Sequence, residues 1–297
     1  MDMGGYLYGK VGGQLNRMDM GGYLYGSFGG KEGDNDTIIN EPIIFVHGVT
    51  LRAGGKDILH LRQLYATTYA DGGHTPFYMN ELECSSPIIF VHGVTLRAGG
   101  KDILHLRLLY ATTYADGGHT PFYMNELECS SVKQIREFIL AVHNYTEKTV
   151  DIIAYSMGVA ISRKSILGGH CVDTGEFLGE PLTEYIDTFV SVGGVAYGME
   201  WCPKNLPACN MIDGMVCDSE YMMDINQAMA RYEGENSFAI YSRDDYIVGQ
   251  VCCGHPCSEL KNANLTIAMR YHDHVTVFTR TMPLQYSLVT NHSGADY

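Results

Sequence analysis

Basic residues are scarce in this 297-residue sequence: 20 lysines and arginines stand against 34 aspartates and glutamates, which gives a formal net charge of −14. A chain of this charge repels a phosphate backbone, so we expect no nucleic-acid partner. Long apolar runs are also missing. Stretches such as residues 88–91 fall far short of the roughly 18 residues that a membrane-spanning helix needs, so we expect no transmembrane segment.

The composition that remains is that of a globular protein. Apolar residues make up 45% of the chain, which is enough to bury a full core and excludes disorder over most of its length. At this length the chain could form one large domain or two small ones.

An internal repeat bears on that choice. Residues 42–86 recur as residues 87–131 with one difference, Gln63 against Leu108. Functional repeat arrays normally diverge between units and need about three units to close a core. We therefore interpret the pair as a recent tandem duplication or an error in the gene model.

Without one copy, about 250 residues remain, close to the size of a single α/β domain. We expect residues 1–41, which contain a shorter repeat, to form an N-terminal segment. Residues 42–86 would be a redundant duplicate, and residues 87–297 would form the functional domain.

The cysteines predict disulfide bonds. Cys84 and Cys129 occupy equivalent places in the two copies, so the unduplicated protein carries an even set, which suggests pairing. Most of these cysteines crowd into residues 202–257, where disulfides would brace loops. The set is Cys129, Cys171, Cys202, Cys209, Cys217, Cys252, Cys253 and Cys257.

N-glycosylation acceptors indicate the same compartment. They are found at Asn35-Asp-Thr, Asn144-Tyr-Thr, Asn264-Leu-Thr and Asn291-His-Ser. Together with the cysteines they favour a secreted glycoprotein. The first residues have neither a basic nor an apolar region, so we expect the signal segment to be missing from the gene model.

Two motifs suggest a zinc site and a phosphate-binding loop, but the spacing of their residues does not fit either. Cys253-Gly-His255-Pro-Cys257 has zinc-ligand residue types, but no second clean pair of ligands accompanies it. Residues 93–101 resemble a phosphate-binding loop, but Thr95 and Asp102 stand where glycine and a hydroxyl residue are needed. We expect no metal and no organic cofactor.

Strands and helices alternate along the chain. Residues 87–93 read as a strand buried on both faces, and a helix starting at Ser130 carries a capping-box pattern at Ser131 and Gln134. This alternation predicts an α/β fold with a mostly parallel sheet and helices on both faces. Further strands are expected at 110–114, 149–154, 188–192, 237–241 and 265–270, and further helices at 102–109 and 159–167.

A strand-turn-helix motif surrounds Ser156. Ala154-Tyr-Ser156-Met-Gly158 is a variant of the G-x-S-x-G nucleophile elbow, in which small residues let strand and helix come close while the serine hydroxyl stays exposed. Its position between a predicted strand and a predicted helix supports Ser156 as a nucleophile. The alternative is an ordinary turn whose serine caps the helix.

A serine nucleophile needs a base, and the base needs a carboxylate to orient it. In this fold the partners follow in the order serine, acid, histidine. The loop after the strand at 237–241 contains Asp244 and Asp245, and we prefer Asp245 because Val248 can anchor its loop. Either residue could instead be a solvated loop charge.

Four histidines follow the acid. His255 lies in the cysteine cluster and His292 lies near the end of the chain. The remaining pair, His272 and His274, follows the last predicted strand, and position alone does not choose between them.

An oxyanion hole requires backbone N–H donors. One donor is expected from Met157, directly after the nucleophile. The other is expected from Val94, after His92-Gly93, with Val49 of the first copy as the alternative. Val94 is preferred because the second copy runs without interruption into the Ser156 region.

These motifs together resemble the class 2 lipases, small α/β-hydrolases that include minimal bacterial lipases and a large nematode group. The resemblance spans most of residues 27–290. It rests on PIIFVHGVTLRAGG at 87–100, YATTYADGG at 110–118, VDIIAYSMGVAISRKSILGG at 150–169, CVDTGEFLGEPLT at 171–183, RDDYIVG at 243–249 and YHDHV at 271–275.

The resemblance implies an α/β-hydrolase fold and the hydrolysis of acylglycerols or related carboxylic esters without a cofactor. It assigns Ser156 as nucleophile, Asp245 as acid and His272 as base, with His274 where the family often has glutamine. The partner would be a lipid or a small ester, with transient contact to a lipid interface. The alternative function is an inactive secreted binding protein on the same scaffold.

Overall fold

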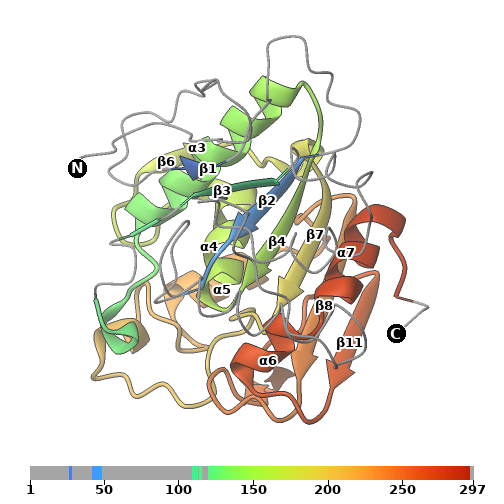
Figure 1. Ribbon diagram of the computed structural model, residues 1–297. Helices are drawn as coiled ribbons and strands as arrows, with labels where there is room; N and C mark the ends of the chain where they lie inside the picture. The colour runs from blue at the N-terminus through green and yellow to red at the C-terminus, as the bar shows by residue number, and fades with distance from the viewer. Residues whose placement is uncertain (1–26, 29–41, 49–108, 113, 116–119, 295–297) are drawn as a thin grey trace, which may run out of the picture.

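The structure is a computed structural model that describes residues 27–28, 42–48, 109–112, 114–115 and 120–294. These residues form an α/β fold in which helices cover both faces of one central sheet (Figure 1). No helix among them is long and apolar enough to cross a membrane.

The described part of the central sheet has seven strands in the order β1-β3-β2-β4-β7-β8-β11. All neighbouring pairs are parallel except β1 with β3. The prediction of a mostly parallel sheet is therefore confirmed. The strands are β1 (Ser27–Phe28), β2 (Ile43–Val46), β3 (Leu109–Thr112), β4 (Val150–Tyr155), β7 (Ile186–Val192), β8 (Asn236–Ser242) and β11 (Leu265–Met269).

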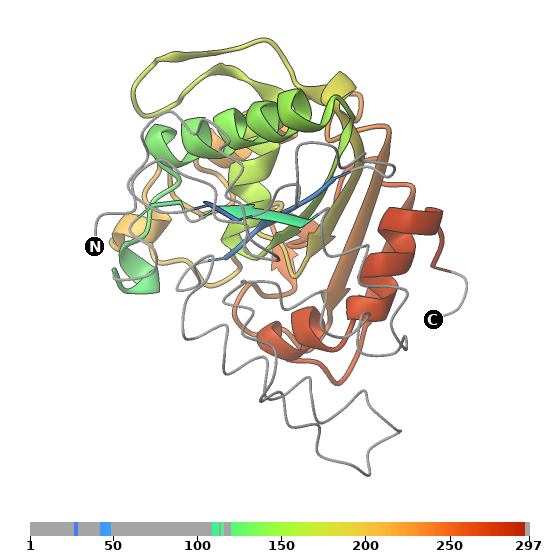
Figure 2. The same ribbon diagram turned by 45° about the horizontal axis from the view of Figure 1, so that its top comes forward.

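The helices lie in two layers, one on each side of the sheet (Figure 2). The α-helices are α3 (Cys129–Thr146), α4 (Met157–Leu167), α5 (Glu220–Asn226), α6 (His274–Thr279) and α7 (Met282–Asn291). Short 3-10 turns are η2 (Phe122–Met124), η3 (Thr183–Tyr185) and η4 (Pro207–Cys209), and two small hairpins pair β5 (Gly169–His170) with β6 (Phe177–Gly179) and β9 (Val251–Cys252) with β10 (His255–Pro256).

Side-chain alternation along the strands explains the two layers. Ile152 and Ala154 of β4 pack in the core on the side of α3 and α4, whereas Ile153 and Tyr155 pack with α6 and α7. Successive side chains of a strand point to opposite faces, so a strand with apolar side chains on both faces needs a helical layer on each side. This is why β4 is buried along its whole length.

One strand comes from an unexpected copy of the repeat. The second copy was expected to supply the strand beside β4, but that place is taken by β2, Ile43–Val46, of the first copy. Residues 87–93 lie outside the described residues, and so does most of the helix expected at 102–109. The second copy still contributes β3 on the other side of β2. The domain boundaries themselves stay a prediction.

Helix α3 begins earlier than its capping pattern indicated. Its N-cap is Glu128 rather than Ser130, and no side chain caps the first turn. The capping box at Ser131 and Gln134 is therefore wrong, because both residues lie inside the helix and are buried. Burial of its apolar face against the sheet outweighed the local capping signal.

The eight cysteines of the unduplicated protein pair completely. The bonds are Cys129–Cys171, Cys202–Cys209, Cys217–Cys253 and Cys252–Cys257. Both cysteines of the rejected zinc motif are oxidised and cannot act as thiolate ligands. Cys84 lies outside the described residues.

Candidate active site

Ser156 occupies a strained turn between β4 and α4. Its backbone has φ 56° and ψ −128°, outside the regions that residues with a side chain normally adopt. Non-glycine residues held this way cluster at functional sites because the surrounding structure must stabilise them. Ser156 N–H donates to the Val192 carbonyl at 3.1 Å, and Ser156 O accepts from Val159 and Val195. The predicted elbow is present.

The space around this turn explains its small residues. A Cβ on Gly158 would lie 2.4 Å from the His47 carbonyl oxygen, so helix α4 can approach the end of β2 only with glycine there. A Cβ on Gly48 would lie 2.7 Å from the Cβ of Ser156. The His-Gly pair after β2 and the Ser156 elbow therefore touch, and each needs the other to be small.

A hydrogen-bonded chain runs from Ser156 through His274 to Asp245. His274 Nε2 lies 2.9 Å from Ser156 Oγ, and His274 Nδ1 lies 2.7 Å from Asp245 Oδ2. The Asp245 carboxylate can only accept here, so Nδ1–H donates to it and Nε2 is left to accept the Ser156 proton. This is the geometry that nucleophilic catalysis by serine requires.

His272 does not take part in this chain. Its Nδ1 lies 2.8 Å from the Arg270 carbonyl in an exposed position. The expectation that His272 contacts Ser156 is thus wrong on geometry. His274 is the first residue of α6, whose N-cap Asp273 forms a capping box with Thr276, and this places its ring over the elbow. The D-x-x-T capping pattern was visible in the sequence and could have pointed to His274.

Asp245 is held from its own loop. Its Oδ1 accepts the backbone N–H groups of Ile247 at 2.9 Å and Val248 at 3.1 Å, which leaves Oδ2 for His274. Val248 is fully buried, as expected of an anchor. Asp244 instead accepts from the Tyr271 N–H.

Tyr155 supports the imidazole and was not anticipated from the sequence. Its ring stacks on His274 with centroids 5.0 Å apart, and its hydroxyl donates to the His274 carbonyl at 3.1 Å. Burial, and then the nearby Asp245 carboxylate, raise the pKa of Tyr155 far above its usual range, so the hydroxyl stays a donor. Its position next to Ser156 in the strand was its only sequence signal.

His47 braces the neighbouring turn in neutral form. Its Nδ1 donates to the Gly48 carbonyl at 2.7 Å, its Nε2 accepts from Tyr114 N–H, and the two rings stack. Burial lowers the pKa of His47 to about 4, only partly offset by the Gly48 hydrogen bond. The ring therefore stays uncharged near neutral pH.

Met157 opens α4, so its backbone N–H is among the first four of the helix, which have no intrahelical partner. This fits a donor that faces a developing negative charge at a helix N-terminus. Val94 and Val49 lie outside the described residues.

The other histidine candidates lie in different surroundings. His255 belongs to the small β9–β10 hairpin and stacks on Tyr197. His292 is exposed at the end of α7 and lies 3.0 Å from Asp187.

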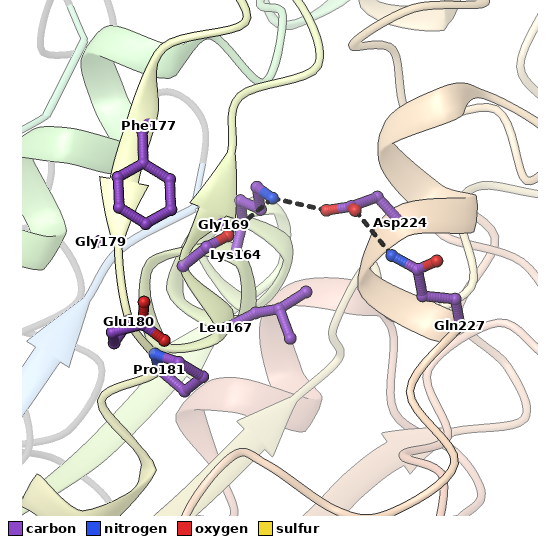
Figure 3. A pocket seen from close by; sticks show the side chains of 10 residues that line it. Lys164, Leu167, Gly169, Phe177, Gly179, Glu180, Pro181, Asp224 and Gln227 are labelled. Atoms are coloured by element: carbon purple, nitrogen blue, oxygen red, sulfur yellow. Dashed lines mark hydrogen bonds and ion pairs between the residues drawn. The ribbon is translucent and has the colours of Figure 1, made fainter.

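A pocket of about 250 Å³ lies at the opposite end of α4 (Figure 3). Its charged lining residues are Lys164, Glu180 and Asp224, and the Lys164 ammonium donates to Asp224 at 2.6 Å and to the Gly168 carbonyl at 2.9 Å. This charge is already neutralised, and Ser156 is not among the lining residues. The hollow is therefore separate from the serine centre.

Comparisons with known proteins agree with the geometry. The family model for lipase (class 2) matches residues 85–287, more than half of the chain and a range that includes Ser156, Asp245 and His274. No curated protein sequence matches the chain.

Among solved structures, the chain is similar to the mature form of the Bacillus licheniformis lipase BlEst2, with a TM-score of 0.52 and 11% identity over 89% of this chain and 98% of that one. A truncated carbohydrate esterase from gut microbiota gives a TM-score of 0.51 and 11% identity over 86% and 87%. Aspergillus fumigatus lipase B, of which the chain spans 44%, gives a TM-score of 0.47 and 12% identity over 78% of this chain, too weak to add to the assignment. The first two likenesses establish the α/β-hydrolase fold.

Proposed function

This chain belongs to the class 2 lipase family and is a carboxylic ester hydrolase, and we propose that it cleaves the ester bonds of lipids through Ser156, His274 and Asp245. The observation that carries the proposal is the continuous chain of hydrogen bonds from Ser156 Oγ through His274 to Asp245. The strained backbone at Ser156 supports it, since such a turn is the place where this fold holds a nucleophilic serine.

In the acylation step, Ser156 Oγ attacks the ester carbonyl carbon while its proton passes to His274 Nε2. The tetrahedral intermediate collapses when the imidazolium returns that proton to the leaving alcohol. An acyl-serine ester remains. Asp245 Oδ2 stabilises the imidazolium through the Nδ1–H hydrogen bond.

Deacylation repeats the sequence with water as nucleophile. His274 Nε2 takes a proton from water, the hydroxide oxygen bonds to the acyl carbon, and Ser156 Oγ leaves with the returned proton. The carboxylic acid is released and the resting state is restored. The same three groups therefore serve both halves of the cycle.

The oxyanion hole would combine the Met157 N–H with that of the residue after a His-Gly pair. The two candidates for the second donor are Val49 and Val94. We propose Val49 rather than Val94 as this donor, because Gly48 of the first copy lies against Ser156. Donors of this kind contribute on the order of 10²–10³ in turnover.

We also propose that the protein is secreted and glycosylated. Four disulfides among the described residues are typical of an oxidising compartment. The acceptors Asn144, Asn264 and Asn291 are exposed, as glycan attachment requires. Digestion of the secreted protein with an amidase that removes N-glycans should lower its mass.

The test of the catalytic proposal uses two neighbouring histidines as a matched pair. On a water-soluble short-chain ester, Ser156→Ala and His274→Ala should each lower turnover by about 10⁴-fold or more, while His272→Ala should stay within about twofold of the wild type. A fluorophosphonate probe should label the wild type and fail on Ser156→Ala.

Two results would contradict the proposal. Full activity in His274→Ala with loss in His272→Ala would return the base to His272. Absence of labelling in the folded wild type would favour the inactive binding scaffold.

A further inference from the structure

Three loops meet at the edge of the sheet where Asp245 and His274 lie. They follow β7, β8 and β11 and comprise residues 199–202, 243–250 and 270–275, which we call the rim loops. In Figure 1 the arrowheads of β8 and β11 end at this edge beside α6. The carboxyl ends of parallel strands share one edge, so loops that follow them are neighbours.

Hydrogen bonds tie the rim loops together. The Glu200 N–H donates to the Val248 carbonyl at 2.8 Å, and the Gln250 N–H donates to the Glu200 carboxylate at 2.6 Å. The Tyr271 N–H donates to the Asp244 carboxylate at 2.5 Å. The second loop is thus hydrogen-bonded to both others, and the three form one continuous surface.

Each rim loop carries one aromatic side chain that is almost wholly exposed. The exposed fraction is 82% for Trp201, 85% for Tyr246 and 91% for Tyr271. Two aliphatic side chains are also exposed: Ile247, two residues after Asp245, and Val275, directly after His274. Exposed apolar side chains gathered at one place mark an interaction site. Tyrosine and tryptophan in particular prefer the boundary between water and lipid.

The charges of the rim loops indicate which kind of lipid surface they could contact. The rim loops contain two cations, Arg243 and Arg270, against the four carboxylates Glu200, Asp244, Asp245 and Asp273, so the rim is acidic like the rest of the chain and has no surplus of basic side chains. Each of these carboxylates also accepts a backbone N–H. An anionic membrane would meet no cationic patch and a negatively charged protein, whereas an uncharged surface would meet no electrostatic penalty.

We propose that the rim loops dock the enzyme on an uncharged lipid surface through Trp201, Tyr246 and Tyr271. This rests on the proposed function, because such docking would bring Ser156 to esters that lie in the surface. A surface-bound substrate reaches the serine only if the edge that carries it lies against the lipid. The three aromatics lie on the loops at that edge, and their burial in the interface would supply the binding free energy.

The chain offers its own probe, since Trp201 is its single tryptophan. The first experiment uses Ser156→Ala, which cannot turn over lipid, with vesicles of phosphatidylcholine. The emission of Trp201 should shift to shorter wavelength as lipid is added. Changing Tyr246 and Tyr271 together to serine should weaken this partitioning by roughly tenfold. Vesicles of phosphatidylglycerol should give a much smaller shift.

The second experiment uses active enzyme and compares two substrates. Tyr246→Ser with Tyr271→Ser should lower hydrolysis of emulsified triacylglycerol by roughly tenfold and leave a soluble short-chain ester unchanged. The matched control is Phe177→Ser, an exposed aromatic on the β5–β6 hairpin at the pocket of Figure 3, which should change neither.

The outcomes separate the docking surface from the chemistry. An unshifted Trp201 emission, together with an unchanged ratio between the two substrates, overturns the docking surface. A shift seen only with anionic vesicles overturns the choice of an uncharged surface. Inactivity of the folded wild type on both substrates overturns the proposed function. The vesicle-binding experiment does not depend on activity, because it uses the Ser156→Ala variant, so its result tests the docking surface separately.

Discussion

The two ends of helix α4 differ in what surrounds them. At its amino end, Ser156 lies in a strained turn close to Gly48 and joins a chain of hydrogen bonds with His274 and Asp245. At its carboxyl end, Lys164 and Asp224 form an ion pair beside a pocket of about 250 Å³. We propose that the chemistry takes place at the amino end, which is marked by backbone strain and a shared proton rather than by a hollow.

The largest difference in turnover is expected between two variants that each add one methyl group, one at the amino end and one at the carboxyl end of α4. Gly158→Ala places a Cβ 2.4 Å from the His47 carbonyl oxygen, so the elbow and the end of β2 must separate. A misplacement of this size should lower turnover on a soluble ester by about 10²-fold. The free energy of unfolding should fall by about 1–3 kcal/mol. Both quantities can be measured on the purified variant.

Its control is Gly168→Ala at the other end. That Cβ would lie 2.4 Å from the Gly179 carbonyl oxygen on a backbone with φ 69°, so stability should fall by a similar amount. The kcat of the folded protein should stay near that of the wild type. If Gly158→Ala and Gly168→Ala lowered kcat equally, the proposal that only the amino end of α4 takes part in catalysis would be wrong.

The next effect concerns pH at the amino end. Burial lowers the pKa of His47 from 6.5 to about 4. Between pH 6.5 and pH 4, His47 is therefore protonated in the unfolded chain but neutral in the folded protein. The free energy of unfolding should therefore fall as pH drops from 6.5 to 4, by on the order of 3 kcal/mol from this residue, and level off below. Urea unfolding of the wild type and His47→Gln over this range measures the difference. If the free energy of unfolding changed with pH equally in the wild type and in His47→Gln, the predicted contribution of His47 would be wrong.

The smallest effect is expected at the carboxyl end. In Lys164→Met, Asp224 keeps its contact with solvent, since 23% of its side chain is exposed, and it still accepts from Gln227. Loss of the partner should therefore cost about 1 kcal/mol, well below the 3–5 kcal/mol of a fully buried pair. Thermal unfolding and ester turnover check this. A large drop in kcat would make the pocket part of the enzyme's function.

Much of the site could be predicted because its signals are local. The elbow needs small residues close to the serine in sequence, and Asp245 is oriented by N–H groups two and three residues further on. The residues close to His272 and His274 in sequence did not show in the same way which of the two would contact Ser156. Both are imidazoles after the same strand, and only the start of α6 at His274 decides which ring meets Ser156.

By itself the sequence determined the alternation of strands and helices, the candidates for nucleophile and acid, and an even set of cysteines, because each depends on residue type and short spacing. The tertiary structure alone decided which histidine closes the chain, which copy of the repeat lies beside β4, and which cysteines pair. In each of these cases the candidates share the same chemistry. Only their distances in the folded chain distinguish them.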